Sequence, residues 1–163
     1  MKTLVLSLLL LSPLILATAA PPKHVIVDHE PGRFGGWPAN NGAWIWGHEI
    51  AVSFVRGWWH DQPDAHSIDR ERPAVVVVAR SLDGGETWKV EAPVSPLHGT
   101  DATNPAPSPG GINFQHPDFA LRVRNNAFHF SYDRARTWQG PYALPDLGVG
   151  ALTARTESGR AHV

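Results

Sequence analysis

The sequence contains no cysteine, and this absence excludes disulfide bonds, thiolate metal sites and a cysteine nucleophile. It also has almost no net charge, because 14 Lys and Arg stand against 15 Asp and Glu. Non-specific binding to nucleic acid needs a basic face, so we expect no nucleic-acid partner. No segment after residue 20 shows a sustained apolar period of 3.6 residues, which argues against amphipathic helices.

Turn-forming and aromatic residues are abundant instead. The chain has 15 Gly, 15 Pro and 7 Trp, and 42% of its residues are hydrophobic. This composition supplies ample core material and is typical of a turn-rich β protein rather than a disordered segment. We therefore expect an all-β fold.

The first 20 residues have the layout of a secretory signal peptide. Lys2 precedes an apolar run at 4–16, and the small residues of 17–19 form a cleavage site after residue 19 or 20. The run is shorter than the roughly 20 residues that a membrane-spanning helix needs. The sequence thus predicts a secreted or periplasmic protein without stable membrane insertion after cleavage, whose folded domain is 21–163.

Two octapeptides repeat without gaps, and the second begins at Ser131, 50 residues after Ser81. The first reads SLDGGETW and the second SYDRARTW. Four positions are shared, namely Ser81, Asp83, Thr87 and Trp88 in the first octapeptide and Ser131, Asp133, Thr137 and Trp138 in the second. Strand-like runs at 74–79 and 127–130 precede the octapeptides, and another β-prone run lies at 50–55. This pattern indicates an all-β repeat protein.

The shared residue types suit a tight β-hairpin turn. The Asp accepts hydrogen bonds from nearby backbone N–H groups, the hydroxyls join the two arms, and the Trp packs against a neighbouring element. Gly85 would take the positive φ that such a turn requires. Ala135 stands at this position in the second octapeptide, and a left-handed alanine costs roughly 1–2 kcal/mol. We therefore expect the second turn to be looser or differently shaped.

The pattern Ser-x-Asp-x-Gly-x-Thr-Trp resembles the Asp box, or bacterial neuraminidase repeat, of the sialidase superfamily. The first octapeptide matches at every position, and the second departs only at Ala135. This resemblance implies a six-bladed β-propeller in which each box lies between the third and fourth strands of a blade, away from the active site. The box therefore indicates the fold and not the catalytic residues.

The spacing of the octapeptides limits how much of such a propeller is present. Six blades at this period need on the order of 300 residues, so 21–163 would hold about two to three blades. An open set of blades leaves strand edges and a sheet face exposed. We expect the chain to be the N-terminal fragment of a longer protein; the alternative is that such units assemble between chains.

The resemblance also implies an arginine that holds the substrate carboxylate, since a guanidinium donates two parallel hydrogen bonds to it. Sialidases use three arginines, the first on the opening strand of the first blade. The segment 32–38 (GRFGGWP) resembles that opening and makes Arg33 the candidate, although the family commonly has Ile-Pro soon after this arginine. The alternative is an exposed loop arginine. Arg56 or Arg70 would support the glycosidic oxygen, and the two later arginines belong to blades that this chain lacks.

The acid/base of the family is an aspartate in the loop after the next strand, which corresponds here to 56–73. Asp61 is the first candidate by position and Asp64 the second, whereas Asp69 could form an ion pair with the adjacent arginine. A general acid needs a raised pKa, which desolvation by Trp58 and Trp59 would provide.

Three further features of the sequence bear on a possible site. His60 and His66 lie near these aspartates, but their intervals match no metal-ligand pattern, so we expect no metal and no cofactor. Asp118 would either reach the sugar from the second blade or, the preferred role, organise the turn into the next strand. Alternation over 121–124 (LRVR) predicts a half-buried strand with a solvated basic face.

The implied function is that of an exo-α-sialidase-like glycoside hydrolase, whose partner is a glycan with a terminal sialic or related acidic sugar. Sialidases use a Tyr–Glu pair as nucleophile. The only two tyrosines are Tyr132, inside the second octapeptide, and Tyr142 just after it. The fragment should therefore be inactive even if its parent is an enzyme. The alternatives are a non-catalytic propeller that binds glycans or proteins through its Trp-rich loop, and one that cleaves neutral polysaccharides with two carboxylates.

Overall fold

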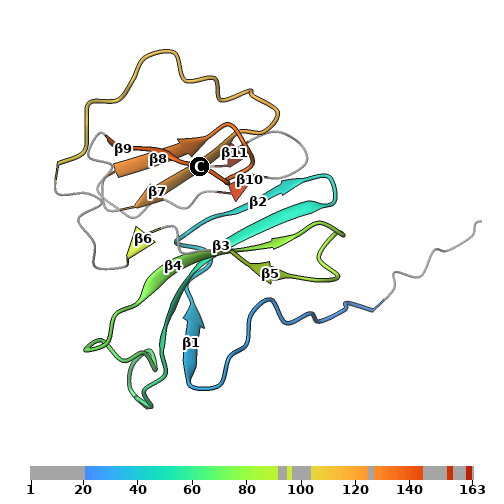
Figure 1. Cartoon of the computed structure of the whole chain (residues 1–163), viewed down its shortest axis with the longest axis vertical. Coiled ribbons are helices and arrows are strands. Elements are labelled where there is room, and N and C mark those ends of the chain that lie inside the picture. The colour runs from blue at the N-terminus through green and yellow to red at the C-terminus, as the bar shows by residue number, and fades with distance from the viewer. Residues whose placement is uncertain are drawn as a thin grey trace, which may run out of the picture.

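The chain folds into two sheets that curl into a half-barrel (Figure 1). A computed structural model describes residues 21–91, 95–96, 104–124, 127–144, 154–155 and 161–162. None of these residues is helical, as the sequence predicted. The expected signal peptide at 1–20 lies outside the described residues.

The first sheet is built around two long neighbouring strands, β3 and β4. Its strands are β1 (Arg33–Gly36), β2 (Ala43–Trp46), β3 (Glu49–Trp58), β4 (Val75–Ser81), β5 (Lys89–Val90), β6 (Ser95–Pro96), β10 (Ala154–Arg155) and β11 (Ala161–His162). Both β1 and β2 pair with the outer edge of β3, and both β5 and β6 pair with the outer edge of β4, all antiparallel. The result is an antiparallel meander with four strand positions. Strands β3 and β4 fill the two inner positions, β1 and β2 share the outer position beside β3, and β5 and β6 share the outer position beside β4. Strand β10 extends it by pairing parallel with β2.

The second sheet is an antiparallel meander of three strands, β7 (Ala120–Arg124), β8 (Ala127–Ser131) and β9 (Gln139–Ala143). The strands expected at 50–55, 74–79 and 127–130 are confirmed as parts of β3, β4 and β8. Each octapeptide forms the turn after the long strand that precedes it, between β4 and β5 and between β8 and β9.

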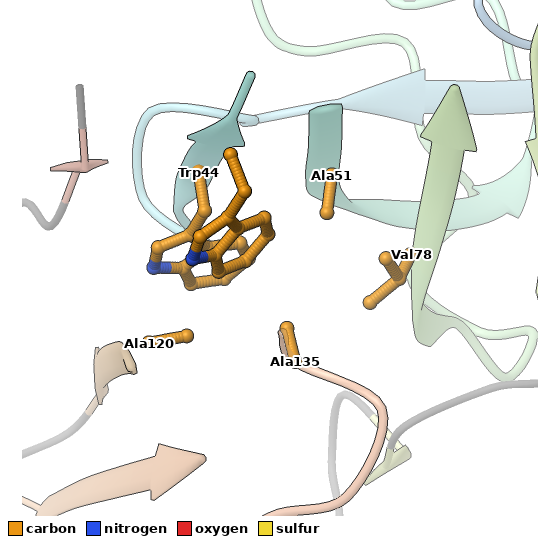
Figure 2. Close-up of a cluster of buried hydrophobic side chains, with 6 residues drawn as sticks. Trp44, Ala51, Val78, Ala120 and Ala135 are labelled. Carbon is orange, nitrogen blue, oxygen red and sulfur yellow. The ribbon is translucent and has the colours of Figure 1, made fainter. Parts of the chain in front are cut away.

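The two sheets pack against each other through a small apolar core (Figure 2). Trp44, Ala51 and Val78 contribute from the first sheet, and Ala120 and Ala135 from the second sheet and its turn. All five side chains are buried because successive strand residues point to opposite faces, and these five share the inner side. The core also holds Trp46 and receives Trp138, whose ring lies 5.4 Å from that of Trp44.

Packing of the sheets overturns one expectation. The predicted solvated basic face of β7 is wrong for Arg122, which is only 2% exposed. Arg122 lies on the same face of the strand as Ala120, and that face packs against the first sheet. The alternation showed that two faces exist, but only the tertiary structure determined that the arginine-bearing face turns inward.

The other face of the first sheet is covered by the segment that precedes β1. Phe54, Val77 and Ala79 form a buried cluster there, against which Val27 and Trp88 pack. Lys23 forms an ion pair with Glu86 and so attaches this segment beside the first octapeptide. Trp88 thus packs on its own sheet and the N-terminal segment, whereas Trp138 packs on the neighbouring sheet.

The first octapeptide closes as predicted, through its serine and aspartate. Gly85 N donates to Ser81 Oγ over 2.8 Å, and Ser81 Oγ donates to Asp83 Oδ1 over 2.7 Å. Asp83 also accepts the backbone N–H of Thr87 at 2.9 Å and the Thr87 hydroxyl at 2.5 Å. Gly85 has a φ of 97°, the positive value that the turn requires.

The second octapeptide repeats these hydrogen bonds, so the expectation of a looser turn is wrong. Ala135 N donates to Ser131 Oγ at 3.0 Å, and Asp133 accepts the backbone and hydroxyl groups of Thr137 at 2.9 and 2.6 Å. Arg134 and Ala135 adopt φ values of 59° and 62°, within the small left-handed region open to L-residues. The hydrogen bonds and the burial of Ala135 hold the turn in this conformation despite its intrinsic cost.

Hydrogen bonds also shift the pKa values of both turn aspartates. The Thr87 hydroxyl, the Thr87 backbone N–H and the Ser81 hydroxyl hold the pKa of Asp83 well below its ordinary value. Burial by itself would raise the pKa of Asp133, but the equivalent donors from Thr137 and Ser131 outweigh it and lower the pKa. Both carboxylates are therefore stabilised in the charged form by the turns that they close.

An ionic cluster joins the two sheets beside the octapeptides. Glu49, the first residue of β3, accepts hydrogen bonds from Arg80 at 2.8 Å, from Arg134 at 2.9 Å and from Arg136 at 2.7 Å. Arg80 also binds Glu91 at 2.6 Å, and Arg134 binds Asp118 at 2.6 Å. Three guanidinium groups and three carboxylates thus balance one another across the junction. We call this set of six residues the Glu49 cluster.

The Glu49 cluster had no visible signal in the sequence. Its partners Arg80, Arg134 and Arg136 lie 31, 85 and 87 residues from Glu49 along the chain. Burial would raise the pKa of Glu49, but hydrogen bonds and charges from the three arginines outweigh it and hold the pKa below its ordinary value. Arginines from both sheets therefore stabilise the charged form of this carboxylate.

Candidate functional site

A pocket opens at the end of the first sheet that lies opposite the octapeptide turn. Its volume is about 310 Å³, and it is lined by Asp28, His29, Glu30, Pro31, Gly32, Arg33, Phe34, Gly35 and Trp59. One wall is therefore the segment that leads into β1, and the other is the residue that follows β3. Figure 1 shows β1 and the β3–β4 connection at the same end of the sheet, away from the β4–β5 turn.

Arg33 reaches this pocket from the first position of β1. It pairs in register with Trp58, and its guanidinium carbon lies 4.1 Å from the centre of the Trp58 ring. Its Nε atom is buried without a hydrogen-bond partner, and none of the described carboxylates forms an ion pair with it. Arg33 is thus a positioned cation with unused donor capacity, as a carboxylate-binding residue would be.

A second arginine lies on the same indole. The guanidinium carbon of Arg72 is 3.4 Å from the centre of the Trp58 ring. Arg72 was not among the residues expected at the site, although it ends a loop rich in charged and aromatic residues. Two guanidinium groups against one aromatic ring give this part of the site local positive character.

Arg56 has a different environment, because its guanidinium forms ion pairs with two carboxylates. Its Nε lies 3.2 Å from an oxygen of Asp28, and its Nη2 forms an ion pair with Glu30. Both acidic residues line the pocket. Arg56 therefore anchors the pocket wall through these ion pairs and is not itself a lining residue, whereas a supporting role at the glycosidic oxygen was expected for it.

The connection between β3 and β4 is an ordered loop. Trp59 pairs with Ile68 in an antiparallel bridge, and Asp69 N donates to Trp58 O at 2.9 Å. Asp61 and Asp64, the candidate acid/base residues, are exposed and do not line the pocket. Because water reaches both carboxyl groups, the indoles of Trp58 and Trp59 do not desolvate them as the acid/base hypothesis required.

Two further loop residues depart from the expected roles. Asp69 accepts the backbone N–H of Glu71 at 2.9 Å and closes a short turn instead of pairing with Arg70. Arg70 is exposed and does not line the pocket. Arg33 is therefore the one candidate arginine that the structure places in the pocket with its donors unused.

Asp118 lies at the opposite end of the molecule from Arg33. Asp118 forms an ion pair with Arg134, and Arg134 also binds Glu49, the first residue of β3. Arg33 instead pairs with Trp58, the last residue of β3. A strand of 10 residues spans roughly 30 Å. The backbone carbonyl of Asp118 also accepts Arg134 N at 3.0 Å, so Asp118 joins the segment before β7 to the second octapeptide and does not line the pocket.

Neither metal ligands nor a tyrosine gather at the pocket. Among the described residues, no group of three or more His, Asp or Glu side chains is placed to hold a metal ion, and His66 packs edge-on against Trp37. Tyr132 accepts a hydrogen bond from Asn113 N at 2.8 Å, and Tyr142 packs against Phe128 in the second sheet. Both tyrosines therefore belong to the structure of the second sheet.

Comparison with protein-family models, with curated proteins and with solved structures finds no match for this chain in any of the three. Within the part of the chain that the structure describes, no helix is long and apolar enough to cross a membrane. The function must therefore be argued from the pocket and its residues.

Proposed function

We propose that the chain is an exported protein that recognises a terminal acidic sugar in the pocket beside Arg33, within a fold of the sialidase propeller type. The observation that carries this proposal is the position of Arg33. Arg33 lines the pocket, its guanidinium lies against Trp58, and it pairs with none of the described carboxylates. A planar guanidinium of this kind suits the carboxylate of a sialic acid.

Two features of the fold support the propeller. The first sheet is an antiparallel meander with the octapeptide between its third and fourth strand positions, which is the place of the Asp box in a blade. The second sheet packs face to face against the first and carries the second octapeptide in the same relation to β8 and β9. The pocket lies at the end away from these turns, where the resemblance puts the substrate.

For this chain, recognition without turnover is better supported than hydrolysis. Asp61 and Asp64 are exposed, and both tyrosines are used in the second sheet. An acidic-sugar hydrolase would need a nucleophile that the described residues do not bring to Arg33. A fluorogenic sialoside should therefore remain uncleaved by the purified chain even at concentrations that saturate the pocket.

Binding is tested by ligand-observed NMR with the methyl α-glycoside of sialic acid and, for comparison, methyl β-galactoside. We expect the acidic sugar to bind and the neutral sugar not to bind. Arg33→Ala should abolish binding, whereas Lys89→Ala, which removes an exposed cation at the other end of the sheet, should leave it unchanged. Equal binding of both sugars, or unaltered binding by Arg33→Ala, would refute the proposal.

A further inference from the structure

Trp59 is an exposed aromatic side chain on an ordered backbone. Its side chain is 56% exposed, comparable with Phe114 at 59%. Its backbone N–H donates to Gly32 O at 3.0 Å, and its bridge partner Ile68 is buried in the cluster of Val55, Ala74 and Val76. The backbone of Trp59 is therefore held in place while the residue stays open to solvent.

Trp59 also lies beside the candidate ligand arginine. Of the four large apolar side chains that are exposed in the described residues (Ile26, Trp59, Leu82 and Phe114), only Trp59 lines the pocket. Trp59 is therefore an exposed aromatic residue at the edge of the pocket.

The size of the pocket limits what it can enclose. At about 310 Å³ it lies at the lower limit of small-molecule sites, which range from roughly 300 to 1,000 Å³. One sugar ring with its carboxylate would occupy most of this space, so the next ring of an oligosaccharide must lie outside it. The open face of Trp59 is the surface available there.

We propose that Trp59 is a specificity-determining residue that stacks on the apolar face of the sugar next to the terminal acidic sugar. The C–H groups on one side of a pyranose carry partial positive charge and fit the electron-rich face of an indole. The ligand class is then an acidic oligosaccharide rather than a free acidic monosaccharide. This inference rests on the proposed function, since Arg33 must first hold the terminal carboxylate.

The experiment compares two ligands that share the same terminal sugar, the methyl α-glycoside of sialic acid and 3′-sialyllactose, by NMR titration. The intact chain should bind the trisaccharide more tightly. Trp59→Ala should weaken trisaccharide binding by roughly five- to tenfold, the effect of about one aromatic contact, and leave the monosaccharide affinity unchanged. Trp59→Phe should restore most of the loss because it keeps an aromatic face.

Phe114→Ala is the matched control, since it removes an aromatic side chain of similar exposure that does not line the pocket. It should bind both ligands as the intact chain does. The stacking role is refuted if Trp59→Ala leaves the trisaccharide affinity unchanged, or if it lowers the affinity for both ligands equally. Arg33-dependent recognition stands in either case. If the monosaccharide does not bind the intact chain at all, the proposed function fails and this inference fails with it.

Discussion

Arg134 Nη1 donates a hydrogen bond of 2.9 Å to Glu49 Oε2 and thereby joins the second sheet to the first. The side chain of Glu49 is 9% exposed, and arginines from both sheets offset the cost of burying its charge. The contact therefore couples the formation of one sheet to the docking of the other.

Replacing Glu49 by Gln should destabilise the protein strongly. The change leaves Arg80, whose side chain is 5% exposed, without one of its two carboxylate partners. Breaking a buried ion pair in this way costs about 3 kcal/mol or more of unfolding free energy. Urea denaturation measures the loss. Glu91→Gln removes the other partner, which is 34% exposed, and should cost no more than about 1 kcal/mol; equal losses for the two variants would show that burial does not set the effect.

Stability should fall in acid because three carboxyl groups have pKa values that folding lowers. Glu49, Asp83 and Asp133 each have a folded-state pKa below the ordinary value. The contribution of these carboxylates to the unfolding free energy is complete above the ordinary carboxyl pKa of about 4. It is lost as the pH falls through their lower folded-state pKa values. Urea denaturation between pH 7 and pH 2 should therefore show a constant unfolding free energy down to about pH 5 and a decline below about pH 4.

A matched variant tests the origin of this decline. Asp133→Asn cannot titrate, so it should be less stable at pH 7 and lose less stability on acidification than the unaltered chain. An increase in stability between pH 5 and pH 3 would contradict the assignment of these carboxylates.

The two octapeptide turns should respond differently to exchange of Gly and Ala. In Gly85→Ala the new methyl has room, since its nearest neighbour would be Ile50 Cδ1 at 3.6 Å, but the φ of 97° is strained for alanine. We expect a loss of about 1–2 kcal/mol. In Ala135→Gly, relief of a similar strain is offset by loss of a buried methyl worth about 0.8 kcal/mol and by the greater chain entropy of glycine. Thermal and urea denaturation should therefore show little change.

Arg56→Ala should free the segment before β1, which forms one wall of the pocket, from its contact with β3 without unfolding the sheet. Arg56 holds Asp28 and Glu30, so its removal should increase hydrogen exchange in the segment before β1 and weaken binding of the acidic sugar. Arg33→Ala should weaken binding without this change in exchange. If exchange of that segment stays the same in Arg56→Ala, the anchoring role is wrong.

Local sequence patterns predicted the elements of this protein well. Runs of β-branched and apolar residues predicted β3, β4 and β8, because a residue's preference for a strand acts within its own segment. The Ser, Asp and Thr positions of the octapeptides predicted the hydrogen bonds of both turns, because donor and acceptor lie within four residues of each other. The assumption that alanine would alter the second turn failed because tertiary burial and hydrogen bonds outweighed a local preference.

The candidate site was predicted only in part. The resemblance of 32–38 to the opening strand of a sialidase indicated Arg33, but nothing in the sequence showed that Arg56 would form ion pairs with Asp28 and Glu30. The resemblance made Asp61 the first acid/base candidate and Asp64 the second, and the folded loop leaves both exposed and outside the pocket.

The sequence by itself determined which segments become strands and how its two octapeptides turn, because those choices depend on near neighbours in the chain. Only the tertiary structure decided which face of each sheet is buried and which arginines form ion pairs with carboxylates. Glu49 and Arg136 show why, since they lie 87 residues apart and meet only after both sheets have formed and packed.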